Sequence, residues 1–197
     1  MCGRYTFYTS EEYREMNRVV EMIEEKYGKG ACPSGEIYPD QKVPILVGRD
    51  QKIDADLLTW GFPRWDKKGL IINARSETAG EKKMFAASLK TRRCIVPSTG
   101  FYEWKKQETG KGKDKYYFTL PGKNSLYMAG LFNVYENQRR FVILTTGANV
   151  TMAPVHHRMP LILENHELKA WLLDDRFAAS RVLQSSPLLE YRFAEAQ

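Results

Sequence analysis

The start of the chain carries the residue with the most distinctive chemistry. The sequence opens Met1-Cys2-Gly3-Arg4-Tyr5, and a cysteine is small enough that an initiator Met before it is normally removed. We therefore expect Cys2 to become the mature N-terminus, with a thiol and a free α-amine on adjacent carbons. Because the reference pKa is near ~7.7–8.0 for an α-amine and about 8.5 for a cysteine thiol, both groups supply a nucleophilic fraction at cellular pH.

An adjacent amine and thiol have one outstanding partner, an aldehyde. The amine condenses to an imine, the thiol adds to the imine carbon, and a five-membered thiazolidine ring closes. The same cysteine is also suited to attack an amide or ester carbonyl, as N-terminal nucleophile hydrolases do. In the third alternative Cys2 begins a strand and has no chemical role. The N-terminus taken alone favours this last alternative.

A polar segment, Asn73-Ala74-Arg75-Ser76-Glu77-Thr78, directly follows the apolar run at 70–72. This order is typical of a strand that ends at a site. Arg75 could bind a phosphate or carboxylate through its planar fork, and Asn73 could orient an amine or a carbonyl. The alternative is a loop in which Ser76 or Thr78 caps the next helix, and the local sequence favours that alternative.

Glu103 lies among aromatic residues in Gly100-Phe101-Tyr102-Glu103-Trp104. A carboxyl buried in such a strand needs a partner or a proton, and burial raises its pKa toward the range of a general acid or base. Strand side chains alternate between faces, so Glu103 could equally point to the solvated face and have no such role. The two alternatives are evenly balanced.

Two of the three histidines, His156 and His157, precede Arg158 and are bracketed by Pro154 and Pro160. A rigid backbone would hold an imidazole that titrates near neutrality. Metal binding is the competing use, but the three Cys and three His show neither C-x-x-C nor H-x-x-x-H spacing. We therefore expect no metal and no cofactor.

Basic and aromatic residues accompany these segments. Cations beside exposed aromatic rings suit a nucleic-acid strand with unstacked bases. The alternative is that the rings are core and the arginines are solvated. The residues are Arg4, Tyr5, Trp60, Phe62, Arg75, Arg92, Arg93, Trp104 and Arg158.

The elements that must position these residues are short strands and a few helices. Apolar residues at spacings of three and four predict a helix over 9–28, with Thr9 and Glu12 as a capping box and Gly28 at its end. Its core-facing stripe is Tyr13, Met16, Val20, Ile23 and Tyr27. Shorter helices are predicted over 81–89 and 167–173.

Strands are predicted where short apolar runs are separated by Gly-, Pro- and Asn-rich turns. One such turn is predicted at 48–50, and 105–115 reads as a charged hairpin loop. The fold class is therefore α+β, a single compact domain over 2–197 with a mostly antiparallel, barrel-like β core and peripheral helices. The predicted strands are 43–47, 57–62, 93–96, 100–104, 116–120, 126–135 and 141–146.

Composition limits the classes of function. The chain has 197 residues, 43% of them hydrophobic, without a run near the roughly 18 apolar residues of a membrane helix. No signal peptide is visible, and three cysteines make no disulfide framework, so we expect a cytoplasmic protein, nucleoid-associated if bacterial. The net charge of +6 permits nucleic-acid binding without requiring it. Nothing indicates a coiled coil or an obligate interface, and we expect a monomer with no membrane partner.

Taken in order, six motifs resemble the SRAP family, whose name stands for SOS response-associated peptidase. The resemblance runs from residue 2 to about Leu172, with two departures. The segment Trp60-Gly61-Phe62-Pro63-Arg64-Trp65 is one residue shorter than the family's W-G-L-I-P-x-W, and Glu36-Ile37-Tyr38 stands where Asn-x-Ala is expected. The motifs are Cys2-Gly3-Arg4-Tyr5, Asn73-Ala74-Arg75-Ser76-Glu77-Thr78, Arg93-Cys94-Ile95-Val96-Pro97, Gly100-Phe101-Tyr102-Glu103-Trp104, Thr145-Thr146-Gly147-Ala148-Asn149 and His156-His157-Arg158-Met159-Pro160.

The resemblance implies a β-rich domain that recognises abasic sites in single-stranded DNA and becomes covalently attached to them. A ring-opened abasic sugar is an aldehyde, the partner that an N-terminal cysteine favours. The resemblance assigns the link to Cys2, the holding of the amine or sugar to Asn73, and the acid/base role to Glu103. His156 would stabilise the opened sugar or shuttle protons, and Arg75 would bind a flanking phosphate.

Other activities remain open for the same residues. Imine formation beside a phosphate invites β-elimination, which would give an AP-lyase-like activity. Autocatalytic removal of the residue before Cys2 would be a peptidase activity, and a non-covalent single-strand binding module is a third possibility. DNA contacts are expected from Gly3, Arg4, Tyr5, Trp60, Phe62, Arg75, Ser76, Glu77, Thr78, Arg92, Trp104 and Arg158.

Overall fold

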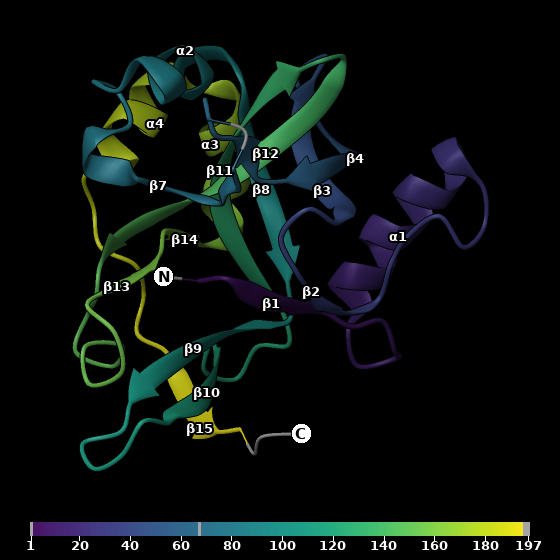
Figure 1. The fold of residues 1–197 in the computed structure, drawn as a ribbon. Coiled ribbons are helices and arrows are strands. Elements are labelled where there is room, and N and C mark those ends of the chain that lie inside the picture. The colour runs from purple at the N-terminus through teal and green to yellow at the C-terminus, as the bar shows by residue number, and fades with distance from the viewer. Residues whose placement is uncertain (1, 67, 195–197) are drawn as a thin grey trace.

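The computed structural model describes residues 2–66 and 68–194, which form a mostly β structure with helices at its periphery (Figure 1). The expected removal of Met1 concerns a residue outside this range. The helices are α1 (Arg14–Tyr27), α2 (Lys83–Thr91), α3 (Leu168–Leu173) and α4 (Asp175–Arg181), with 3₁₀ turns at Ser76–Thr78 and Asn165–Glu167. The strands are β1 (Arg4–Phe7), β2 (Gly35–Ile37), β3 (Lys42–Arg49), β4 (Lys52–Trp60), β5 (Phe62–Pro63), β6 (Leu70–Ile71), β7 (Asn73–Arg75), β8 (Arg93–Ser98), β9 (Gly100–Lys106), β10 (Lys113–Thr119), β11 (Leu126–Tyr135), β12 (Gln138–Gly147), β13 (Arg158–Pro160), β14 (Ile162–Leu163) and β15 (Glu190–Phe193).

A closed barrel forms the centre of the fold. Its strands follow the order β12–β4–β3–β8–β11, and the pairing of β11 with β12 closes the ring. Neighbouring barrel strands are antiparallel except β12 and β4, which meet in parallel at their ends. Closure leaves no unpaired strand edge around the ring. The predicted α+β class with a barrel-like core is confirmed.

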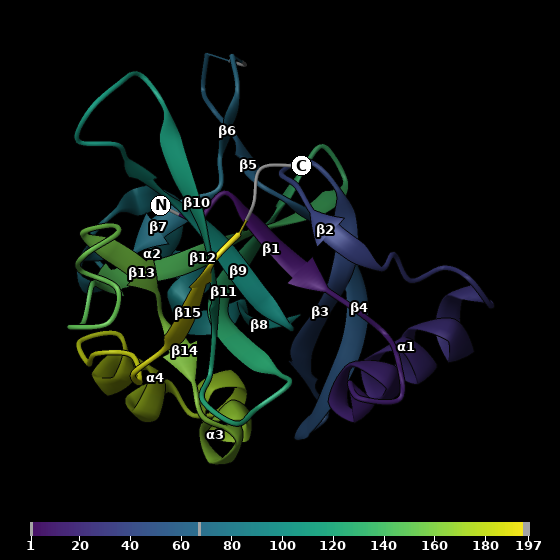
Figure 2. The same ribbon diagram turned by 90° about the horizontal axis from the view of Figure 1, so that it is seen from below.

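A second sheet of five strands packs below the barrel in Figure 1 and faces the viewer in Figure 2. Its order is β15–β10–β9–β1–β2, with every neighbouring pair antiparallel. Only Thr99 separates β8 of the barrel from β9 of this sheet, and its N–H donates to the Thr6 carbonyl at 2.8 Å. The chain therefore passes directly from one sheet to the other beside β1.

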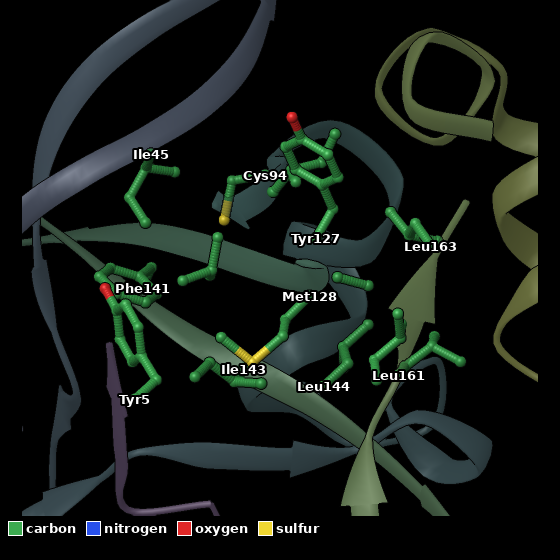
Figure 3. Close-up of a cluster of buried hydrophobic side chains, with 14 of the residues drawn as sticks. Tyr5, Ile45, Cys94, Tyr127, Met128, Phe141, Ile143, Leu144, Leu161 and Leu163 are labelled. Atoms are coloured by element: carbon green, nitrogen blue, oxygen red, sulfur yellow. The ribbon is translucent and has the colours of Figure 1, made fainter. Parts of the chain in front are cut away.

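Aromatic and aliphatic side chains from both sheets fill the interior (Figure 3). Tyr5 of β1 contacts Trp60 with ring centroids 5.3 Å apart, and Trp60 stacks on Phe141 at 6.2 Å. Burial of such rings is the main source of core stability. Because Tyr5 lies three residues from Cys2, this packing also fixes the start of the chain.

Helix α1 confirms the prediction only in part. It ends at Gly28, whose φ of 90° suits glycine, and it buries Met16 and Ile23 as expected. The capping box is wrong, because residues 10–13 form a turn and the Thr9 hydroxyl donates to Ser34 Oγ at 3.3 Å. Val19 faces the core, whereas Tyr27 is 45% exposed.

Most of the predicted strands form and extend beyond the predicted ends, but 57–62 is wrong as a single strand, because Gly61, with a φ of 107°, separates β4 from β5. The predicted turn at 48–50 begins too early. Gly48 and Arg49 still belong to β3, and Asp50 and Gln51 adopt the positive φ angles that close the β3–β4 hairpin. Strands β9 and β10 also extend into 105–115, which leaves a loop at 107–112. No helix in the described part of the chain combines the length and hydropathy needed to span a membrane.

Candidate functional site

Cys2 lies at the junction between the barrel and the five-stranded sheet, since it precedes β1 of that sheet and contacts Asn73 of β7, which pairs with barrel strand β12. Only Gly3 separates it from β1, which is held on both sides by β2 and β9. The thiol is buried, with the residue 1% exposed, and Sγ donates to the Arg4 carbonyl at 3.7 Å. Burial raises the pKa of the Cys2 thiol well above its ordinary value, and the charge of Glu103 raises it further. The thiol is therefore protonated at neutral pH.

Asn73 reaches Cys2 from a different sheet. It begins β7, which runs parallel to β12 and pairs Asn73 with Ile143. Its Nδ2 donates to the Cys2 carbonyl at 3.0 Å. Its Oδ1 is buried and has no hydrogen-bond partner among the described residues. This oxygen is thus an acceptor beside Cys2 that suits an N–H donor.

Glu103 is buried at 4% exposure on β9, on the same strand face as Phe101. The structure therefore places it inside and not on the solvated face. Its Oε1 accepts a hydrogen bond from the Trp104 N–H at 3.3 Å. The charge of Glu103 helps to raise the pKa of the Cys2 thiol and opposes the lowering of the His156 pKa by burial. Glu103 therefore lies within electrostatic reach of both.

His156 ends a tight turn between β12 and β13. The Asn149 side chain organises this turn by accepting the Met152 N–H at 3.2 Å, and the His156 N–H then donates to the Met152 carbonyl at 3.0 Å. His156 Nδ1 lies 3.0 Å from the Arg158 backbone nitrogen and 3.2 Å from the Arg158 carbonyl oxygen, so the backbone of Arg158 holds the imidazole ring in place. Burial lowers the pKa of His156 below its ordinary value, against the pull of Glu103.

The structure thus brings the four predicted chemical residues together from four separate segments. Cys2 precedes β1, Asn73 is on β7, Glu103 is on β9 and His156 is in the turn before β13. The arrangement combines a buried thiol, a carboxylate and a neutral imidazole. Such a set can accept and return protons around one electrophilic carbon.

Among the residues with expected DNA contacts, a first group is accessible. Arg75 and Glu77 are exposed, Gly3, Arg4, Thr78, Arg92 and Trp104 are half-buried, and Ser76 is buried behind them. The Arg4 guanidinium lies over the Tyr38 ring at 4.4 Å and over the Trp104 ring at 5.2 Å. Arg4, Arg75 and Trp104 lie on β1, β7 and β9, residues 76–78 follow β7 in a 3₁₀ turn, and Arg92 directly follows α2.

A second group lies in the core. Tyr5, Trp60 and Phe62 are at most 1% exposed, and Trp60 Nε1 donates to the Ile72 carbonyl at 3.0 Å. Their rings have no open face on which a base could stack in this structure. Arg158 is 9% exposed and bonds the Glu77 carboxylate and the Thr145 carbonyl. These four residues belong to the buried framework of the protein and not to its accessible surface.

Three residues that sequence reasoning did not assign to the site line the surface beside Arg4. Glu36, Tyr38 and Lys115 join Arg4 and Trp104 around a cavity of about 600 Å³. Their signal in the sequence is weak, because Glu36 and Tyr38 only alternate with Ile37 at the end of β2 and Lys115 lies far along the chain on β10. Strand pairing is needed to bring those positions onto one face. Among the described residues, no three His, Cys, Asp or Glu side chains gather as they would around a metal ion.

Several curated proteins are similar in sequence to this chain. The abasic site processing protein YoaM of Bacillus subtilis is 32% identical over 185 residues, covering 87% of this chain and 79% of the relative. YedK of Escherichia coli, also named an abasic site processing protein, is 31% identical over 180 residues, covering 87% and 79%. HMCES of Xenopus tropicalis, with the same descriptive name, is 34% identical over 181 residues, covering 71% of this chain and 53% of the relative.

Solved structures share the fold. A protein from Bacteroides thetaiotaomicron superimposes with a TM-score of 0.79 at 24% identity, covering 98% of this chain and 92% of that chain. A phage-related protein from Bordetella bronchiseptica gives 0.76 at 24% identity, covering 99% and 95%. Residues 1–194 match the family described as SOS response associated peptidase (SRAP). The resemblance noted in the sequence is therefore confirmed, and the chain belongs to the SRAP family.

Proposed function

We propose that this protein processes abasic sites by capturing them in single-stranded DNA through a thiazolidine link to Cys2. The observation that carries the proposal is the convergence of Cys2, Asn73, Glu103 and His156 at one junction. The relatives named abasic site processing proteins support the choice of lesion. The proposal requires that Met1 be removed, since only a terminal Cys2 has the free amine.

The reaction proceeds in two bond-forming steps. The Cys2 amine attacks the C1′ aldehyde of the ring-opened sugar, and loss of one water gives an imine. The S–H then adds across the C=N bond, with sulfur bonding to carbon and the proton ending on nitrogen. The buried thiol needs a base for this addition, and Glu103 accepts the proton and returns it.

Asn73 acts on the Cys2 amine, and His156 acts on the oxygen of the sugar. The buried Oδ1 of Asn73 accepts a hydrogen bond from the amine, which directs the nitrogen lone pair to the aldehyde. His156, whose ring is held at Nδ1 by the Arg158 backbone, stabilises the sugar oxygen as the ring opens and shuttles its proton. Arg75, exposed at the end of β7, binds a phosphate that flanks the lesion.

A denaturing gel tests the proposal. Met-processed protein is incubated with a single-stranded oligonucleotide carrying one abasic site, then heated in detergent. We expect a slow band that is missing with Cys2→Ala and with an undamaged strand. Absence of the band, with Met1 shown to be removed by mass, would refute covalent capture.

The same experiment separates the other activities of this site. A shortened oligonucleotide would report β-elimination, and hence an AP-lyase-like activity. Retention of Met1 in purified Glu103→Gln protein, but not in the parent, would report autocatalytic removal and hence a peptidase activity. Binding of the strand without either product would leave a non-covalent single-strand module.

A further inference from the structure

A second cluster of charged side chains lies on the outer face of the five-stranded sheet, apart from the four-residue site. It joins Arg4 of β1, Glu36 of β2 and Lys115 of β10. Glu36 Oε2 accepts a hydrogen bond from Arg4 Nη1 at 3.2 Å, and Glu36 Oε1 accepts one from Lys115 Nζ at 3.2 Å. Two cations from different strands therefore converge on one carboxylate.

Aromatic rings frame this ion cluster. Tyr38 and Trp104 flank the Arg4 guanidinium, and the Tyr38 hydroxyl donates to Glu36 Oε2 at 2.9 Å. Lys115 Nζ lies 3.9 Å from the centre of the Tyr102 ring. Cations set among aromatic faces beside a cavity of about 600 Å³ suit a single strand, which offers phosphates and unstacked bases together.

The three charged side chains are partly desolvated, which strengthens their interaction. Arg4 is 29% exposed, Glu36 22% and Lys115 15%. Burial by itself raises the pKa of Glu36, but the hydrogen bonds from Tyr38 and Lys115 outweigh it and lower the pKa below its ordinary value. Glu36 therefore keeps a negative charge at neutral pH, at the place where a phosphate would meet the two cations.

A phosphate and the Glu36 carboxylate need the same donors. Arg4 is two residues from Cys2, about 7 Å along an extended chain, so a strand with its abasic sugar at Cys2 brings a neighbouring phosphate close to Arg4. The guanidinium fork binds carboxylates and phosphates in the same way. A DNA strand can therefore bind both Arg4 and Lys115 only if their hydrogen bonds to Glu36 are broken.

We propose that Glu36 is an internal competitor of the DNA backbone, which occupies Arg4 and Lys115 in the free protein and is displaced by one strand phosphate on binding. The inference rests on the proposed function for the identity of the ligand. The Glu36 carboxylate therefore weakens binding to undamaged DNA strands. Retention of a damaged strand then depends on its covalent bond to Cys2. Glu36 and Tyr38 are also the two positions at which this chain departs from the family's Asn-x-Ala pattern.

The test measures affinity for a short, undamaged oligodeoxythymidine by fluorescence anisotropy over a series of salt concentrations. Glu36→Gln keeps an acceptor for Tyr38 but removes the charge. We expect it to bind roughly three- to tenfold more tightly, with a salt slope steeper by about 0.7, because no displaced carboxylate remains to take up a salt cation when the DNA strand binds. Glu36→Asp keeps the charge and should bind within about twofold of the parent.

Asp54→Asn is the matched control for net charge. Asp54 pairs with Lys26 and Arg49 on the other side of the barrel, so its removal changes the charge equally but away from the cavity. We expect it to change the affinity by less than about twofold. Lys115→Gln gives a second, independent test, because loss of one cation should weaken binding and flatten the salt slope.

The outcomes separate this inference from the proposed function. An equal gain in Glu36→Gln and Asp54→Asn, or no gain in Glu36→Gln, would overturn the competitor role even where the covalent band forms. Tighter binding by Glu36→Gln in a protein that forms no covalent band would uphold the inference and refute covalent capture. No binding by either the parent or Glu36→Gln would overturn the competitor role, and the denaturing gel with the abasic strand would still decide covalent capture.

Discussion

The Arg158 guanidinium holds the Glu77 carboxylate through two hydrogen bonds, Nη1 to Oε1 at 2.5 Å and Nη2 to Oε2 at 2.9 Å. Arg158 begins β13 two residues after His156, and Glu77 follows Asn73 by four residues. The ion pair therefore ties the histidine turn to the end of β7. We expect this pair to set the separation of His156 from Asn73, and so the width of the site.

Arg158→Lys tests this positioning. A single ammonium cannot reproduce the two-bond fork, so we expect a loss of about 1–2 kcal/mol in the free energy of unfolding and roughly tenfold slower adduct formation. Thermal unfolding and single-turnover gels measure the two effects. Arg181→Lys is the control, since Arg181 is also buried against a carboxylate, Glu167, but away from Cys2. If both variants slow the reaction equally, the slowing reflects general destabilisation and not the width of the site.

Glu103→Gln should slow adduct formation roughly 10²-fold while strand affinity stays close to that of the parent. The reason is that the buried thiol of Cys2 needs a proton acceptor, and an amide cannot serve as one. Quenched time points on denaturing gels give the rate, and anisotropy gives the affinity. Glu190→Gln, an exposed glutamate of β15, controls for loss of one negative charge. Equal rates in Glu103→Gln and the parent would remove Glu103 from the acid/base role.

The lowered pKa of His156 predicts that the folded protein loses stability as the pH falls. Its pKa is lowered in the folded protein, so the unfolded chain binds a proton more readily, and folding is favoured while the ring is neutral. This contribution is complete above the unfolded value near ~6.5 and is lost as the pH falls through the lower folded pKa. Thermal unfolding across this range should show a smaller decline for His156→Gln than for the parent. The exposed His166 provides the control His166→Gln, which should decline as the parent does.

Arg75→Ala should weaken binding to undamaged single strands and lower the salt slope by about 0.7, because one arginine–phosphate interaction disappears. Affinity measured over a series of salt concentrations gives both quantities. Lys52→Ala removes an equally exposed cation from the far end of β4, eight residues from Trp60, and should leave the slope unchanged. A reduced affinity with the parent's slope would mean that Arg75 acts on folding and not on the DNA backbone.

The sequence determined the local structure and the chemical candidates. Short apolar runs between turn residues were enough to predict most of the strands, because a buried strand is a short apolar segment bounded by turn residues. Cys2, Asn73, Glu103 and His156 stood out because each is a reactive side chain in an unusual local setting. Family membership also followed from six short motifs in order, and the match over residues 1–194 confirms it.

Only the tertiary structure decided which side of a strand faces the site and which charges meet. Glu103 had two equal alternatives until the pairing of β9 with β1 and β10 placed it inside. Trp60 and Phe62 looked like base-stacking residues in the sequence, yet barrel closure buries both. Arg158 with Glu77, and Arg4 with Glu36, are pairs of residues 81 and 32 positions apart. Such pairs depend on the register of distant strands, which no local pattern of residues records.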